Sequence, residues 1–152
     1  MNKNHDEITI VPMNESHIPA IAEIERSCFS TPWSEKALAE ELGVASAVFL
    51  TALVGGTVAG YMGAHHLSDC AYVCNVAVSP EFRRRYVASA LIAAQTDAAR
   101  AAGMREMTLE VRASNAPARA LYEKFGFVHV GTRPNFYSGP KENAEIYTLT
   151  FE

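Results

Sequence analysis

A strand, an arginine-rich loop, a helix and a second strand follow one another across residues 73–111, and this order constrains the fold more than any other feature. Residues 71–78 are rich in β-branched side chains, which is typical of a strand. Across residues 87–102 apolar side chains recur at helical spacing, and Gly103 ends the helix. Two strands joined through a helix predict a right-handed parallel crossover. The pattern indicates an α/β or α+β fold.

Further elements are predicted on both sides of this unit. Asn14 and Ser34 are suitable helix N-caps, and the Gly55-Gly56 pair indicates a hairpin turn. The other predicted strands are residues 8–11, 47–54, 57–65, 106–111, 127–133 and 145–151, and the other helices are residues 15–28, 35–42 and 116–125. A three-layer fold is therefore expected, with a mixed sheet flanked by helices.

Length and composition indicate an ordinary soluble protein. The 152 residues suffice for one domain, expected to span residues 1–152, and leave little room for a second. Hydrophobic residues make up 49% of the chain and charged residues 20%. No apolar run approaches the ~20 residues of a membrane-spanning helix. Residues 1–7 lack the apolar core of a signal peptide, so a cytoplasmic protein without membrane contact is expected.

The cysteines and the net charge argue against two further classes of protein. Cys28, Cys70 and Cys74 are an odd number and form no disulfide framework. Because no Cys or His pair stands at ligand spacing, no metal site is expected, and the cysteines are interpreted as buried or half-buried thiols, with Cys70 and Cys74 on one side of a strand. The net charge of −4 argues against nucleic-acid binding.

The loop before the long helix carries Arg83, Arg84 and Arg85. The free N–H groups and the dipole of a helix N-terminus attract anions. Guanidinium groups also bind phosphate oxygens well. A phosphate site is therefore one interpretation of this turn, and a solvated basic turn is the other. The residue types alone do not separate the two.

The wider sequence favours the phosphate site. Residues 75–91 resemble motif A of the GNAT acetyltransferases, Q/R-x-x-G-x-G/A, with Arg83 in its first position and Ala88 in its last. Residues 32–36, 109–115, 120–127 and 133–137 resemble the RimI-like branch, the ribosomal-protein alanine N-acetyltransferases. The resemblance spans about residues 8–151. It implies a GNAT fold, with a central mixed and mostly antiparallel sheet, and acetyl transfer from acetyl-CoA.

Tyr86 departs from the motif, because a glycine is expected at its position. If the position needs a positive φ, a side chain there costs ~1–2 kcal/mol, and the ring would crowd a pyrophosphate. Alternatively, the turn is helical enough to accept tyrosine, and Arg84 offsets weaker backbone contacts.

The resemblance also implies which residues hold acetyl-CoA. The backbone amides of Val76 and Val78 are expected to hold the thioester and pantetheine, and the backbone of residues 84–89 the pyrophosphate. The Asn115 side chain is expected to contact the cofactor as well. The complete expected set is Val76, Ala77, Val78, Arg83, Arg84, Arg85, Tyr86, Val87, Ala88, Ser89 and Asn115.

Two residues match the catalytic positions of the RimI family: Glu110 the general base and Tyr122 the general acid. Glu110 lies in an apolar run, where desolvation would raise its pKa toward a value useful for accepting a proton. The alternative is an exposed carboxylate on the polar face of a strand. The phenol of Tyr122 has an ordinary pKa of ~10, whereas the thiol that leaves as coenzyme A has a pKa of ~8.5. Proton transfer from the phenol to the thiolate is therefore uphill and must be late or assisted. The alternative for Tyr122 is an aromatic side chain that only packs.

Amine chemistry bears on the acceptor. A protein α-amino group of pKa ~8 is about one-tenth neutral at pH 7, whereas lysine near ~10.4 is neutral less than about once in a thousand. The resemblance implies the N-terminal alanine of protein eighteen of the small ribosomal subunit as acceptor. Trp33, Asn135 and Tyr137 are candidates for the substrate-side rim.

Other interpretations of the acceptor side stay open. A small amine is an alternative acceptor, and a catalytically weak acyl-CoA-binding module is an alternative to an enzyme. The acidic residues Glu25, Glu35, Glu40 and Glu41 either attract a basic protein tail or form solvated helix faces. A monomer or weak homodimer is expected.

Overall fold

The computed structural model describes residues 7–151. The N-terminal stretch in which no signal peptide is expected, residues 1–7, lies outside the described residues except for Glu7. A seven-stranded sheet has the order β1-β2-β3-β4-β5-β7-β6. Its strands are β1 (Ile8–Pro12), β2 (Ala47–Val54), β3 (Thr57–Leu67), β4 (Cys70–Val78), β5 (Glu106–Arg112), β6 (Val128–Tyr137) and β7 (Glu142–Thr150). The helices are α1 (Ile18–Cys28), α2 (Glu35–Glu41), α3 (Val87–Ala101) and α4 (Ala116–Lys124), with 3-10 turns at Glu15–His17 and Pro80–Phe82.

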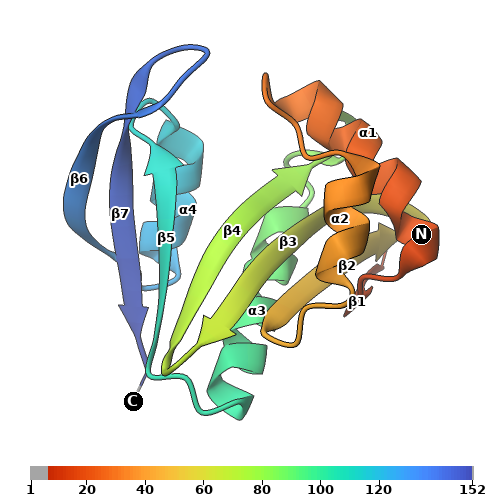
Figure 1. Ribbon diagram of the computed structural model, residues 1–152, viewed down its shortest axis with the longest axis horizontal. Coiled ribbons are helices and arrows are strands. Elements are labelled where there is room, and N and C mark those ends of the chain that lie inside the picture. Colours follow the sequence, from red (N-terminus) through yellow and green to blue (C-terminus); the bar gives the residue numbers. More distant parts are fainter. Residues whose placement is uncertain (1–6, 152) are drawn as a thin grey trace.

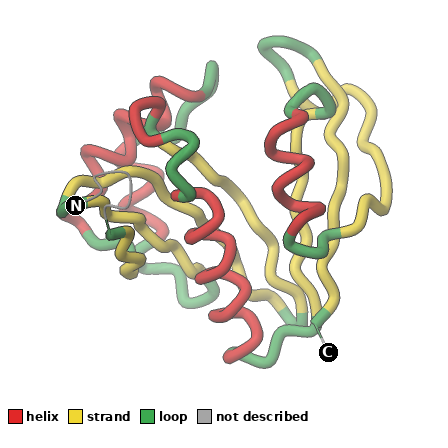
Figure 2. Tube along the Cα trace, turned by 180° about the vertical axis from the view of Figure 1, so that it is seen from behind, coloured by secondary structure: helices red, strands yellow, loops and turns green. Residues whose placement is uncertain are grey.

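Helices cover both faces of the sheet. α1 and α2 pack on one face, where Ile21, Leu38, Phe49 and Tyr61 belong to one core cluster. α3 packs on the opposite face, and its Leu91 belongs to a second cluster that includes residues of β5, α4 and β7. Figure 1 shows α1 and α2 in front of the sheet, and Figure 2 shows α3 and α4 from behind. The predicted three-layer fold is confirmed. Within residues 7–151, no helix has both the length and the apolar character needed to cross a membrane.

The last hairpin is longer than predicted. β6 continues to Tyr137 and β7 begins at Glu142, whereas the predicted strands end at residue 133 and begin at residue 145. Pro134 has no N–H to donate, which argues against a strand at that point of the sequence. β6 is an edge strand, and its register shifts between Arg133 and Tyr137, so the proline is accommodated.

The sheet opens between β4 and β5. These strands form the predicted parallel crossover through α3, whereas the other described strand pairs are antiparallel. The parallel pairing runs only from Cys70 with Glu106 to Tyr72 with Thr108. Beyond these residues the two strands diverge (Figure 1). The part of β4 that leads into the arginine-rich loop is therefore not paired with β5. Backbone groups on this part of β4 are placed to bind a ligand.

A bulge in β4 changes the predicted positions of the cysteines. Ala64 of β3 faces Val73 and Gly63 faces Asn75, so Cys74 is an extra residue in the ladder. Cys70 is buried and Cys74 is exposed, so the expectation of a buried or half-buried thiol is wrong for Cys74. Across residues 7–151, no three or more His, Cys, Asp or Glu side chains form a group that could hold a metal ion.

Candidate active site

A cleft of about 410 Å³ lies where the arginine-rich loop meets the start of α3. The first N–H groups of α3 have no carbonyl partner within the helix, and they stand at the positive end of its dipole. Arg83 and Arg84 add two guanidinium groups to the lining. A pyrophosphate suits this combination of donors and charge. The lining residues are Val78, Phe82, Arg83, Arg84, Tyr86, Val87, Ala88, Ser89 and Leu121.

The backbone of the loop is left-handed at two residues that are not glycine. Arg84 has a φ of 64°, and Tyr86, the N-cap of α3, has a φ of 67° and a ψ of 15°. Of the two interpretations of Tyr86, the structure supports the one in which its position requires a positive φ. A side chain in this conformation costs ~1–2 kcal/mol. Tyr86 is 74% exposed, so its ring lies at the solvent side of the cleft.

We expect Tyr86→Gly to bind coenzyme A at least as tightly as the wild type, because glycine adopts positive φ without a Cβ penalty. Calorimetric titration of both proteins with coenzyme A measures the effect. Tyr86→Ala is the matched control, because it removes the ring and keeps the Cβ. Weaker binding by both variants would show that the tyrosine ring itself contacts the cofactor.

Strand β4 offers fewer free groups than expected. The N–H of Val76 donates to Oδ1 of Asn75 at 3.1 Å. The side chain of Ala77 is buried on the α1 face, so it points away from the cleft. Asn115 is the N-cap of α4, and its Oδ1 accepts the N–H three residues further on at 3.3 Å. Because the side-chain oxygen of Asn115 is used in this cap, the predicted contact of Asn115 with the cofactor would be made by its side-chain nitrogen.

Glu25 of α1 is fully buried, so the interpretation as a solvated helix face is wrong for this residue. Its Oε2 accepts hydrogen bonds from the Tyr61 hydroxyl at 2.5 Å and from Nδ2 of Asn75. Its Oε1 accepts the backbone N–H of Trp33 at 2.9 Å. Burial raises the pKa of Glu25, and its hydrogen bonds oppose the rise. Through Asn75, this carboxyl group is connected to Val76, where the thioester is expected to bind.

Glu110 points away from the core. Its neighbours Leu109 and Val111 belong to the cluster beneath α3, whereas Glu110 is exposed. Its Oε2 accepts a hydrogen bond from Nε of Arg133 at 2.6 Å. The expected desolvation is therefore wrong, because strand alternation turns the carboxylate to the uncovered face of β5. In this position the carboxylate reaches solvent, and it is able to accept a proton through a water molecule.

Tyr122 is 7% exposed and packs against Phe127 and Tyr147, with ring centroids 5.6 and 6.4 Å away. It lies in the same cluster as Leu109, so Tyr122 and Glu110 lie on opposite faces of β5. Burial, and to a smaller extent the charge of Tyr137, raises the pKa of Tyr122 to about 12. A phenol this weak donates hydrogen bonds, but its proton transfer to a thiolate of pKa ~8.5 is steeply uphill. The need for a late or assisted transfer is thus stronger than expected.

Comparison with known proteins assigns the chain to a family. Residues 18–127 match the acetyltransferase (GNAT) family. The chain belongs to this family. The ribosomal protein bS18-alanine N-acetyltransferase of Escherichia coli (strain K12) is 34% identical over 143 residues, which are 93% of this chain and 96% of that protein.

Solved structures similar to this chain include the following two. The ribosomal-protein-S18-alanine N-acetyltransferase from Escherichia coli has a TM-score of 0.87 and 33% identity, covering 95% of this chain and 94% of that one. Ard1 from Thermoplasma volcanium has a TM-score of 0.86 and 28% identity, covering 95% and 98%. The resemblance to RimI-like enzymes, the mixed GNAT sheet and the assignment as an N-acetyltransferase are confirmed.

The predicted acceptor-side residues of this GNAT chain have different surroundings. Trp33 is half-buried, with its ring centroid 5.9 Å from that of Phe49, so packing explains much of its position. Asn135 is exposed, and its backbone N–H donates to an asparagine side chain of β7. Tyr137 is half-buried, and burial followed by the charge of Glu110 raises the pKa of its phenol. The charge of Glu110, the predicted base, therefore acts on Tyr137.

Sequence reasoning missed three residues of the site. Phe82 and Leu121 line the cleft, and the guanidinium carbon of Arg85 lies 5.1 Å from the centre of the Phe82 ring. Arg112 binds the turn between β6 and β7. Arg112 lies in the motif of residues 109–115 and Leu121 in that of residues 120–127, and both motifs carry the family resemblance. The resemblance assigns no role to either residue, so it did not identify them as part of the site. No sequence signal identifies Phe82.

Proposed function

We propose that this GNAT enzyme transfers the acetyl group of acetyl-CoA to the α-amino group of a protein that begins with alanine. The acceptor proposed is ribosomal protein bS18. The likeness to the Escherichia coli enzyme over almost its whole length carries this proposal, because it includes the acceptor-side segments as well as the cofactor cleft.

The donor is proposed from the cleft. The N-terminus of α3, Arg83 and Arg84 provide donors and positive charge for a pyrophosphate. Val78 and Leu121 add apolar lining for a pantetheine chain. When bound, acetyl-CoA supplies an activated acetyl group as a thioester. The open edge of β4, with Val76 and Val78, is the proposed place for that thioester.

The proposed chemistry uses two side chains. Glu110 accepts a proton from the α-ammonium group of the acceptor through water, which leaves a neutral nitrogen as nucleophile. Tyr122 donates a hydrogen bond to the leaving sulfur, and its raised pKa keeps the phenol protonated at neutral pH. An α-amino group matches this arrangement better than lysine, since ~10% of it is already neutral near pH 7.

Competition for acetyl-CoA tests this function. The enzyme is incubated with acetyl-CoA, an alanine-initiated peptide and a mixture of polyamines, amino acids and aminoglycosides. We expect the peptide to carry nearly all of the product, and the same peptide with a blocked N-terminus to carry none. Turnover of the small amines with no acetylated peptide would refute the acceptor. Thermal stabilisation by acetyl-CoA without any transfer would indicate a binding module instead.

A further inference from the structure

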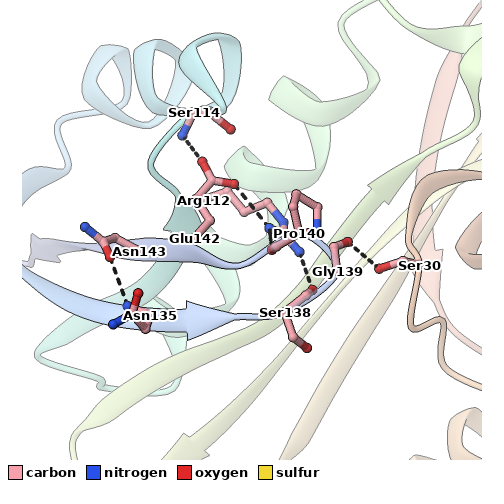
Figure 3. A network of polar contacts seen from close by, with 9 residues as sticks. All are labelled: Ser30, Arg112, Ser114, Asn135, Ser138, Gly139, Pro140, Glu142 and Asn143. Atoms are coloured by element: carbon pink, nitrogen blue, oxygen red, sulfur yellow. Dashed lines mark hydrogen bonds and ion pairs between the residues drawn. The ribbon is translucent and has the colours of Figure 1, made fainter.

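Arg112, at the end of β5, binds the turn that joins β6 to β7 (Figure 3). Its Nη1 donates to the carbonyl oxygen of Pro140 at 2.8 Å and to Oε1 of Glu142 at 3.1 Å. Its Nη2 donates to the carbonyl oxygen of Ser138 at 3.0 Å. One guanidinium group therefore holds both sides of the turn at residues 138–140.

These contacts need the shape of arginine as well as its charge. A guanidinium group presents several N–H donors in a planar fork, whereas lysine presents one compact ammonium group on a flexible stem. The Arg112 side chain is 28% exposed and Glu142 is 17% exposed, so the pair is partly shielded from solvent. Oε2 of Glu142 also accepts the N–H of Ser114 at 2.5 Å, which fixes the carboxylate from its other side.

The turn held by Arg112 lies next to Tyr137, one of the predicted acceptor-side residues. The guanidinium carbon lies 4.5 Å from the centre of the Tyr137 ring, and Tyr137 is near enough to Glu110 for that charge to affect it. Across the opening of the sheet, the Ser30 hydroxyl donates to the carbonyl oxygen of Gly139 at 2.9 Å. The turn thus spans from β5 to the loop after α1, at the end where β4 and β5 diverge (Figure 1).

We infer that Arg112 is a positioning residue for the acceptor, because it holds the 138–140 turn and Tyr137 beside Glu110. The role toward the acceptor rests on the proposed function. The anchoring of the 138–140 turn by Arg112 does not depend on that function. The Arg112 side chain does not line the cleft, so we expect its replacement to act on the acceptor and to leave cofactor binding intact.

The kinetic test compares Arg112→Gln and Arg112→Lys with the wild type. We expect both to raise the KM for an alanine-initiated peptide about tenfold, with kcat within about threefold and acetyl-CoA affinity within about twofold. Arg100→Gln, on the exposed face of α3, is the matched control and should leave all three values unchanged. An unchanged KM in Arg112→Gln, or full recovery in Arg112→Lys, would overturn the inference.

A second readout needs no turnover. Lys141 is exposed next to the turn, and trypsin cleaves after it only when the surrounding chain can open. We expect Arg112→Gln to speed cleavage after Lys141 at least about tenfold, as followed by mass spectrometry, and Arg100→Gln to leave it unchanged. Unchanged cleavage in Arg112→Gln would refute the anchoring role. A wild type that acetylates no alanine peptide would refute the proposed function while this measurement still decides whether Arg112 holds the turn.

Discussion

Glu110→Gln is expected to lower kcat for an alanine-initiated peptide by roughly 10²-fold, because general base catalysis typically contributes 10²–10⁴-fold. The amide keeps the size of the carboxylate and removes its ability to accept a proton. Glu110 lies on the uncovered face of β5 and outside the cleft lining, so acetyl-CoA affinity should stay within about twofold. Steady-state kinetics and calorimetric titration measure the two quantities.

Two controls isolate the proton transfer. Arg133→Gln breaks the ion pair with Glu110 and keeps the carboxylate, so its kcat should fall much less. Glu106→Gln removes the same charge from the other end of β5 and should leave turnover near the wild-type value. If Glu110→Gln weakens acetyl-CoA binding as much as it lowers turnover, the residue supports the structure and is not the base.

Glu25→Ala is expected to lower the free energy of unfolding by about 3–5 kcal/mol, because each buried donor left without an acceptor costs about 1–3 kcal/mol. The Tyr61 hydroxyl, Nδ2 of Asn75 and the N–H of Trp33 all lose an acceptor in the interior. For a chain of this length the melting temperature should fall by roughly 10 °C. Glu23→Ala, on the exposed side of α1, is the control and should change little. Equal shifts in the two variants would contradict the network.

The pH dependence of stability gives an independent check on Glu25. Burial raises the folded-state pKa of this carboxyl group above its unfolded value of ~4.3. Its contribution to stability is therefore fully present below about pH 4.3 and is lost as the pH rises through the folded pKa. The stability difference between the wild type and Glu25→Gln should shrink across that range. A difference that grows with pH would mean that the carboxylate is stabilised in its charged form.

The helices and strands could be predicted from the sequence because their signals are local. Ser34 caps α2 as expected, and the Gly55-Gly56 turn joins β2 to β3. Asn14 caps the 3-10 turn Glu15–His17, and α1 begins only after that turn, with His17 as its N-cap. The bulge at Cys74 could not be predicted, since it depends on how β4 pairs with β3. The left-handed backbone at Tyr86 contradicts the preference of tyrosine, and the glycine of the motif left it as one of two interpretations that only the structure separates.

The surroundings of charged side chains were the least predictable part of the site. Glu110 lies in an apolar run, but the alternation of β5 exposes it. Glu25 falls on the apolar side of its helix, which was a usable signal, but its partners come from β3, β4 and the loop after α1. Arg112 acts on a turn about 26 residues further along the chain, and no local pattern links the two.

Tandem mass spectrometry of one acetylated peptide shows which nitrogen the enzyme acetylates. The peptide begins with a free alanine and contains one internal lysine, and it is incubated with the enzyme and acetyl-CoA. The expected result is an acetyl group on the α-nitrogen of the alanine, with the lysine unmodified. Acetylation confined to the lysine side chain, or no acetylated peptide while small amines are turned over, would contradict it.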